Sequence, residues 1–355
     1  MDRDLGDVKP YENVKVDSWN AVGKAQVFYA SPQRRSFRSI TRLLKETPHD
    51  LLYLNGFFNP VFTLRPIIAQ KYIRILRRPT IVAPRGEFAE SALALKRWKK
   101  YFFIGVGRII GLFDGVIWHA STDFEMRDIE RVRRVRRTDI RIAINITEKS
   151  EQIEPEVAPL EVQGNAALRV CFLSRIAPMK NLTFALNVLA KTNIPIQFTI
   201  CGPKESSAYW SECQKLIDNL PSNVVAIYEG SVEPSQVRKT IARHDVFFVP
   251  TLGENFGHVF LEAFSAGVPV LVSDKTPWRG LQKRKLGWDI DLDRPEDFGN
   301  ALEELANYDV VRRREMRASC FQFAVEKMES KEALMMNRRL FLDALQKDVV
   351  NLRAS

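Results

Sequence analysis

Two glutamates, Glu254 and Glu262, lie within residues 251–269, which read TLGENFGHVFLEAFSAGVP. The apolar run Asp245–Pro250 before them predicts a buried strand, and the Gly-Val-Pro at the end of the segment predicts the end of a short helix. A helix N-terminus offers unpaired N–H groups and partial positive charge to an anion, and each carboxylate can accept hydrogen bonds from a pair of hydroxyls. This combination indicates a ligand in which a diphosphate joins a sugar to a ribose.

The same segment resembles the signature of retaining family 4 glycosyltransferases of the GT-B fold. That signature has two glutamates separated by seven residues in a frame of Glu-x-Phe-Gly, Glu-Ala and Ala-Gly-x-Pro-Val, and every part of the frame is present. The resemblance implies that Glu262 holds the ribose hydroxyls and that Glu254 holds the donor sugar. The neighbours Asn255, Phe256 and Gly257 are expected to contribute binding groups beside Glu254.

Two cations, Arg175 and Lys180, lie within residues 173–180 (LSRIAPMK), directly after another apolar run. The family resemblance implies that both neutralise the donor diphosphate, Arg175 as a bidentate donor and Lys180 as a point charge. Fixed cations can stabilise the leaving diphosphate as the anomeric carbon gains positive charge. Glu254, Arg175 and Lys180 are therefore the expected catalytic set, and neither a metal nor a cofactor beyond the nucleotide-sugar donor is expected.

Other polar or glycine positions follow predicted strands, where ligands of parallel sheets bind. Gly202 is expected to line the nucleotide site, and Arg85 is a candidate ligand for acceptor or phosphate. His258 either contacts the sugar or phosphate or lies on a helix surface. His119 ends a strand, where a packed histidine is more typical than a ligand-binding one. Many family members carry a cleft histidine where this chain has Pro-Arg-Gly around Arg85, so no catalytic histidine is expected.

Composition indicates a globular protein of about two domains, since the chain has 355 residues and 45% hydrophobic content. The four cysteines lack metal-like spacing and are expected to be reduced core thiols of a cytoplasmic protein. No apolar run approaches the ~20 residues that span a bilayer, and the first residues do not resemble a signal peptide. The run Asp289–Asp293 is similar to a metal-binding Asp-x-Asp, but its alternation with apolar residues favours an ordinary strand.

Positive charge is concentrated in the N-terminal part of the chain. Residues 1–150 contain 28 Lys and Arg against 16 Asp and Glu, an excess of 12, whereas the remaining residues contain 25 against 27. Cations mix with aromatic or aliphatic residues in 71–78 and 96–103, as in an interfacial segment, and cluster again in 131–137. This pattern predicts either contact with an anionic inner membrane leaflet or solvated helix faces. Nucleic acid is not an expected partner, because no nucleic-acid-binding motif accompanies the charge.

Short apolar runs alternate with helix-length amphipathic segments, which predicts parallel βαβ units. The pattern stops in the polar stretch 148–164 and then resumes. The expected strands of the first half are 25–29, 50–54, 79–83 and 115–119, with helices at 36–45, 64–76 and 93–112. The expected strands of the second half are 169–173, 196–201, 224–229, 246–249 and 268–272.

The predicted fold is α/β of the GT-B class, with two doubly wound Rossmann-like domains that face each other across a cleft. The expected parts are an acceptor-side domain at 1–150, a linker at 151–165, a nucleotide-sugar-binding domain at 166–330 and a helix at 331–355 that crosses back toward the first domain. Family members usually open with a strand, a glycine-rich loop and a helix. The sequence before Val14 has no such pattern, which predicts that the first βα unit is missing.

These features favour a metal-independent, retaining glycosyltransferase that moves a hexose-type sugar from a nucleoside diphosphate. The resemblance alone implies a polysaccharide, lipopolysaccharide or lipid-linked acceptor. The cysteines and the lack of a signal-peptide pattern predict a cytoplasmic protein, and the charge pattern makes the inner membrane face a candidate location. The alternative is a catalytically impaired GT-B protein that binds a sugar nucleotide or an anionic membrane. A sugar-nucleotide epimerase is disfavoured, because no added histidine and acid are in place for proton abstraction.

Overall fold

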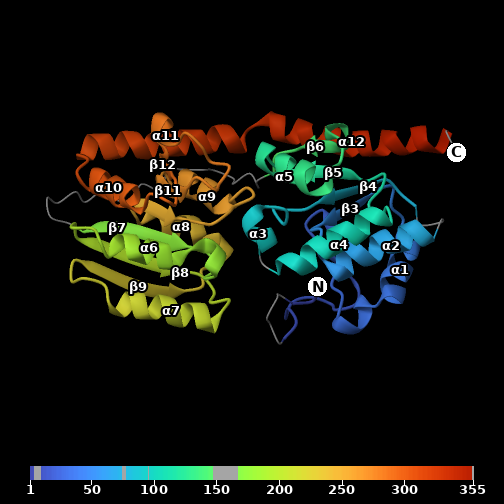
Figure 1. The fold of residues 1–355 in the computed structure, drawn as a ribbon, viewed down its shortest axis with the longest axis horizontal. Helices are drawn as coiled ribbons and strands as arrows, with labels where there is room; N and C mark the ends of the chain where they lie inside the picture. The colour runs from blue at the N-terminus through green and yellow to red at the C-terminus, as the bar shows by residue number, and fades with distance from the viewer. Residues whose placement is uncertain (4–8, 74–76, 95, 147–166, 354–355) are drawn as a thin grey trace. The chain divides into compact units, whose positions relative to one another are not determined.

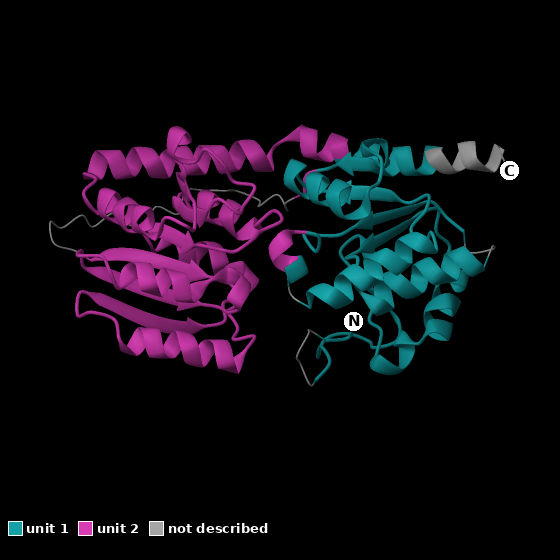
Figure 2. Cartoon of the chain, in the orientation of Figure 1, with its two compact units in different colours: residues 1–88, 93–143, 337–355 teal, residues 89–92, 144–336 magenta. Residues whose placement is uncertain are grey.

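The protein folds into two compact units in the computed structural model, which describes residues 1–3, 9–73, 77–94, 96–146 and 167–353 (Figure 1). Unit 1 comprises residues 1–88, 93–143 and 337–355, and unit 2 comprises residues 89–92 and 144–336 (Figure 2). The predicted linker at 151–165 lies outside the described residues.

Unit 1 is built on a parallel sheet with the strand order β3-β4-β5-β6. Strands β4 and β5 are buried along their whole length, as expected for the inner strands of a sheet covered on both faces. Helix α1 packs on α2, and α4 packs on α5. The elements are β3 (Leu52–Asn55), β4 (Thr80–Ala83), β5 (Ile117–Ala120), β6 (Ile140–Ile142), α1 (Phe37–Glu46), α2 (Arg65–Tyr72), α3 (Glu90–Ala94), α4 (Arg97–Ile109) and α5 (Asp123–Arg133).

The first predicted strand, residues 25–29, does not join the parallel sheet, so the expected βαβ unit at this place is wrong. Strand β2 (Ala25–Phe28) instead pairs antiparallel with β1 (Trp19–Val22). Only two residues connect these strands, and Gly23 has φ +56°. A two-residue turn permits an antiparallel hairpin, whereas a parallel pair needs a crossover of a dozen or more residues.

The predicted helix at 93–112 is also wrong, because it is divided into α3 and α4. Lys96, at the start of α4, has φ +58°, a left-handed conformation that cannot continue a helix. Helix α2 ends at Tyr72, several residues before the predicted end at 76, since the backbone of Ile73 is extended.

Helix α12 (Lys331–Arg353) contributes its residues from 337 onward to unit 1. Asp343 forms an ion pair with Arg141, and its carboxylate is 2.5 Å from Nε of the arginine. Phe341 stacks on Tyr53 with ring centroids 5.8 Å apart. An ion pair therefore connects strand β6 to helix α12.

Unit 2 is a parallel sheet with the strand order β12-β11-β10-β7-β8-β9. Helices α6, α7 and α10 pack together, as do α8, α9 and α11, which gives two helical layers with the sheet between them. The elements are β7 (Leu168–Leu173), β8 (Ile196–Cys201), β9 (Val224–Gly230), β10 (Val246–Val249), β11 (Val270–Ser273), β12 (Gly287–Ile290), α6 (Leu182–Leu189), α7 (Ser207–Asp218), α8 (Val237–Ala242), α9 (His258–Ser265), α10 (Pro295–Ala306) and α11 (Val310–Met328).

The direction of winding in unit 2 reverses between β7 and β10, which are hydrogen-bonded neighbours although 72 residues separate the end of one from the start of the other. Chain connections leave this point in opposite directions. In open α/β sheets that switch point is the place where ligands bind.

Candidate active site

The loops after β7 and β10 meet at the switch point of unit 2. Met179 supplies one carbonyl to both the amide of Leu252 at 2.9 Å and the hydroxyl of Thr251 at 3.0 Å. The side-chain amide of Asn181 donates to the carbonyl of Pro250 at 3.1 Å. These three bonds tie the two loops together, and they bring Lys180 of the first loop to Glu254 of the second.

Lys180 and Glu254 form an ion pair with 2.5 Å between Nζ and Oε2, and we name it the Lys180–Glu254 pair. Their side chains are only 13% and 16% exposed. A charge this deeply placed is stabilised by its partner, because desolvation alone is costly. Both residues were predicted as site residues, but their pairing was not predicted.

The turn before α9 brings backbone close to Glu254. Gly257 has φ +73°, and a Cβ at this position would lie 2.5 Å from the Phe260 ring and 2.9 Å from Cγ of Glu254. The indole N–H of Trp278 donates to the carbonyl of Phe256 at 2.5 Å and fixes the turn. In the part of the chain that the structure describes, no side chain caps the start of α9, so its first amides and partial positive charge face the turn.

Glu262 lies one turn into α9. Its side chain is half-buried, and no group of the described residues donates a hydrogen bond to its carboxylate. Burial raises the pKa of Glu262, because the charged form loses solvation that nothing nearby replaces. A carboxylate in that state is ready to accept hydrogen bonds from ligand hydroxyls.

Glu262→Gln should stabilise the ligand-free protein at neutral pH. Since the folded-state pKa is raised, folding favours the protonated carboxyl, and the wild type loses stability as pH rises through that pKa. The glutamine variant does not titrate, so its melting temperature should exceed that of the wild type at pH 7 by about 1–4 °C. The difference should vanish below the ordinary glutamate pKa.

The matched control for this titration is Glu212→Gln, which alters an exposed glutamate of α7 and should leave the melting curve unchanged at every pH. A Glu262→Gln protein that is less stable than the wild type at pH 7 would show that Glu262 supports the fold rather than a ligand.

Arg175 follows β7 but does not join the Lys180–Glu254 pair. Its guanidinium forms an ion pair with Glu205, and its side chain is 62% exposed. Gly202 has φ +131°, and a Cβ there would lie 1.9 Å from the carbonyl oxygen of Ser174. The absent side chain lets the end of β8 approach the loop that carries Arg175, so the structure gives Gly202 a positioning role, and its contact with ligand stays a prediction.

Two further predicted residues flank the turn. His258 is exposed at the first position of α9, with its ring 4.8 Å from that of Phe256 and its Nε2 3.5 Å from Nδ2 of Asn145. The backbone N–H of Asn255 donates to Oε1 of Glu254 at 3.3 Å. Asn255 therefore contacts Glu254, whereas His258 contacts Phe256 and Asn145.

Arg85 belongs to unit 1, where it lies at the carboxyl ends of β3 and β4. Its guanidinium donates to Oδ1 of Asn55 at 2.7 Å and to the hydroxyl of Tyr53 at 2.9 Å. That hydroxyl is 2.6 Å from Nδ1 of His119, whose Nε2 is 2.7 Å from the carbonyl of Ala143. Because the carbonyl can only accept, Nε2 carries the proton and Tyr53 donates to Nδ1.

Burial lowers the pKa of His119 and raises the pKa of Tyr53, so both stay neutral while they hold Arg85. His119 is packed, as sequence analysis favoured. Tyr53 and Asn55 were not predicted as partners of Arg85. Both occur in β3, which pairs with the strand that leads to Arg85, and that adjacency was the available signal.

The acidic run after β11 has a structural explanation in the described residues. Asp289 accepts from the amides of Leu281 at 2.8 Å and Gly280 at 3.1 Å. It also pairs with Nε of Arg279 at 3.3 Å. Its carboxylate therefore fixes the loop before β12, and no cluster of three potential metal ligands occurs in the part of the chain that the structure describes.

A family match covers the part of the chain that carries the predicted site residues. Residues 163–322, which contain Arg175, Lys180, Glu254 and Glu262, match the family Glycosyl transferases group 1. An uncharacterized 41.2 kDa protein in the cps region of Klebsiella pneumoniae is 23% identical over 301 residues, 83% of this chain and 79% of that protein.

Solved structures resemble the chain over most of its length. Anabaena Alr3699/HepE in complex with UDP-glucose has a TM-score of 0.68 at 15% identity and covers 89% of this chain and 85% of its own. The apo form of the lipopolysaccharide outer core galactosyltransferase WaaB has a TM-score of 0.59 at 15% identity, with coverages of 89% and 84%. The chain thus has the predicted GT-B fold, and its residues 163–322 are similar to the glycosyl transferases group 1 family.

Proposed function

We propose that the chain is a retaining family 4 glycosyltransferase that needs no metal and moves a hexose-type sugar from a nucleoside diphosphate. The observation that carries the proposal is the Lys180–Glu254 pair, which lies at the switch point beside the uncapped start of α9. The loop after β7 contributes a lysine, and the segment after β10 contributes helix amides and two carboxylates. Together these groups suit a ligand with phosphate at its centre and hydroxyls at both ends.

In this reaction the bond between the anomeric carbon and the diphosphate oxygen breaks, and a bond to the acceptor oxygen forms on the same face. Lys180 and the amides of α9 neutralise the departing diphosphate, which takes the proton of the acceptor hydroxyl. Glu262 accepts hydrogen bonds from the ribose, and Glu254 accepts them from the donor sugar. Lys180 must exchange its bond to Glu254 for phosphate, which leaves the Glu254 carboxylate open to the sugar.

The acceptor belongs to the same proposal: a polysaccharide, a lipopolysaccharide or a lipid-linked glycan. The relative encoded in a cps region and the lipopolysaccharide galactosyltransferase support it. Arg85, held by Tyr53 and Asn55, is the proposed ligand for an anionic group of the acceptor or of the donor.

Arg175→Ala should weaken the binding of UDP by about tenfold or more, because it removes a charge-assisted contact to phosphate worth roughly 1.5–3 kcal/mol. Uridine should bind as tightly as to the wild type. Calorimetric titration measures both. The control is Arg243→Ala, which removes an arginine of similar exposure, 60%, that pairs with Glu229. Equal losses for UDP and uridine would contradict the assignment of Arg175.

We also propose that unit 1 contacts an anionic membrane through α4. Trp98, Phe102 and Ile109 are 72%, 70% and 85% exposed, and their spacing places them along one side of the helix. Lys99 lies over the Trp98 ring at 5.3 Å. Exposed aromatics interleaved with cations are typical of interfacial helices. No helix among the described residues is long and apolar enough to cross a bilayer.

The double variant Trp98→Ser, Phe102→Ser should reduce cosedimentation with vesicles containing phosphatidylglycerol by at least about tenfold, because each buried aromatic contributes ~1.5–3 kcal/mol. Phe124→Ser, which alters a 44% exposed aromatic of α5, is the control. Wild-type binding that is indifferent to lipid charge and to salt would contradict the proposal.

A further inference from the structure

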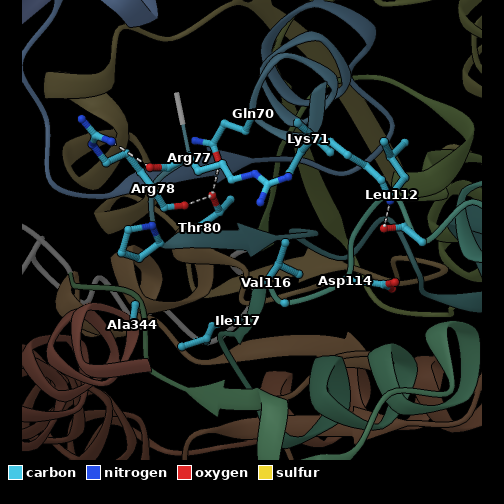
Figure 3. Close-up of a pocket in the computed structure, with 14 residues that line it drawn as sticks. Gln70, Lys71, Arg77, Arg78, Thr80, Leu112, Asp114, Val116, Ile117 and Ala344 are labelled. Carbon is cyan, nitrogen blue, oxygen red and sulfur yellow. Dashed lines mark hydrogen bonds between the residues drawn. The ribbon is translucent and has the colours of Figure 1, made fainter. Parts of the chain in front are cut away.

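A pocket of about 340 Å³ opens in unit 1 at the amino-terminal ends of β4 and β5 (Figure 3). Pro79 and Thr80 at the start of β4 line it, together with Val116 and Ile117 at the start of β5 and Ala344 of α12. Arg85 lies at the opposite, carboxyl-terminal ends of the strands. Substrates of parallel α/β sheets bind at the carboxyl ends, so the pocket is separate from the site described above.

Gln70 of α2 gives the pocket a polar group that lacks a partner. The residue is 8% exposed, and its Oε1 accepts from the hydroxyl of Thr80 at 2.9 Å. Its Nε2 is buried and has no hydrogen-bond partner among the described residues. A buried amide without an acceptor costs free energy, so a ligand with an acceptor oxygen would relieve that cost.

Cationic side chains line the same pocket. Figure 3 shows the Arg77 guanidinium extending across it toward Lys71. Lys71 donates to the carbonyls of Ile110 and Gly111, both at 2.6 Å, and an ammonium has a third hydrogen to give. Asp114 is the one acid among the pocket residues, so the lining carries net positive charge even without Arg78. Arg77 and the Gln70 amide together suit the oxygens of a phosphate group.

Exposed apolar side chains are neighbours in sequence of residues that line the pocket. Tyr72, next to Lys71, is 68% exposed, and Ile109 and Ile110, which precede Gly111, are 85% and 47% exposed. A free phosphate ester would make no use of these side chains, whereas a lipid would place its glycerol and acyl carbons against them.

We propose that the pocket binds the phosphate of an anionic phospholipid headgroup, with Arg77 and Gln70 as its ligands and Tyr72, Ile109 and Ile110 against the adjoining carbons. The inference rests on the membrane contact proposed for α4 and adds a defined headgroup site to it. It does not depend on sugar transfer.

The test measures binding of the full chain to phosphatidylcholine vesicles with and without phosphatidylglycerol. Arg77→Gln and Gln70→Met should each weaken binding to the anionic vesicles by about tenfold, the effect of one lost hydrogen bond to a charged group. Arg78→Gln is the matched control, because the Arg78 guanidinium, although it lines the pocket, already donates to the carbonyls of Arg77 and His49. It removes the same charge one position further on and should retain most of the binding.

Three outcomes would overturn the proposal. Equal losses from Arg77→Gln and Arg78→Gln would show diffuse attraction between charges, and unchanged binding by a folded Gln70→Met protein would show that the buried amide meets no ligand. Titration with glycerol 3-phosphate supplies the third: Arg77-dependent binding of this ester without Arg77-dependent vesicle binding would assign the pocket to a soluble phosphate. Failure of the wild type to bind anionic vesicles would instead contradict the membrane contact itself, and with it the lipid site.

Discussion

Lys180→Met should lower kcat/KM for sugar transfer by about a hundredfold or more, the usual consequence of removing a group that stabilises charge in the transition state. The ammonium is held at 2.5 Å from Glu254 in a largely buried position, whereas Arg175 of the same loop pairs with Glu205 and is mostly exposed. UDP should bind more weakly as well, whereas uridine should bind normally. Initial rates with a nucleotide-sugar donor and calorimetry with UDP check these expectations.

The same variant should also destabilise the ligand-free protein, by roughly 1–3 kcal/mol, because Glu254 keeps its buried charge without a partner. The double variant Lys180→Met, Glu254→Gln should recover most of that stability but none of the activity. Lys215→Met, at an exposed position of α7, is the control. Near-normal transfer by a folded Lys180→Met protein would contradict the role of the Lys180–Glu254 pair.

Glu254→Gln should reduce transfer by a similar factor of about a hundred while UDP binds as tightly as before, or more tightly. The amide cannot hold the sugar hydroxyls as a carboxylate does, and it no longer competes with phosphate for Lys180. Glu262→Gln should behave differently, because the loss of the ribose contact weakens UDP and its sugars alike. The two glutamates thus have separable effects.

Titration of the Glu254→Gln and Glu262→Gln variants with UDP and with a UDP-sugar distinguishes the roles of the two glutamates. If Glu254→Gln weakened UDP and the UDP-sugar by the same factor, Glu254 would contact the nucleotide and not the sugar, and its proposed role would be wrong.

Much of the sheet of unit 2 follows from the sequence, because its strands are apolar runs bounded by glycine or proline, such as Ile196–Cys201 before Gly202. The pairing of strands does not follow so directly. The segment Ala25–Phe28 alternates like any strand, and only the short turn at Gly23 indicates that it forms a hairpin with its neighbour. The three-residue strand β6 (Ile140–Ile142) is too short to give a period, and it was missed.

The candidate site divides in the same way. Residue types near strand ends identify Arg175, Lys180, Glu254 and Glu262, since ligand chemistry leaves a local pattern. Contacts between segments that are distant in the chain leave no local sequence pattern. The Lys180–Glu254 pair joins residues 74 positions apart, and it exists because the crossover through β8 and β9 returns the chain to lie beside β7. The bond from Arg85 to Tyr53 likewise depends on the register of β3 and β4.

The central claim is that unit 2 binds a nucleoside-diphosphate sugar at the Lys180–Glu254 pair and α9. The most direct test is the unfolding free energy of the wild type and Lys180→Met measured across a series of nucleoside diphosphates and their sugars. At a hundred times its dissociation constant for the wild type, one of them should add roughly 2.7 kcal/mol to the stability of the wild type and much less to that of the variant. No stabilisation by any nucleotide sugar, or equal stabilisation of both proteins, would contradict the claim.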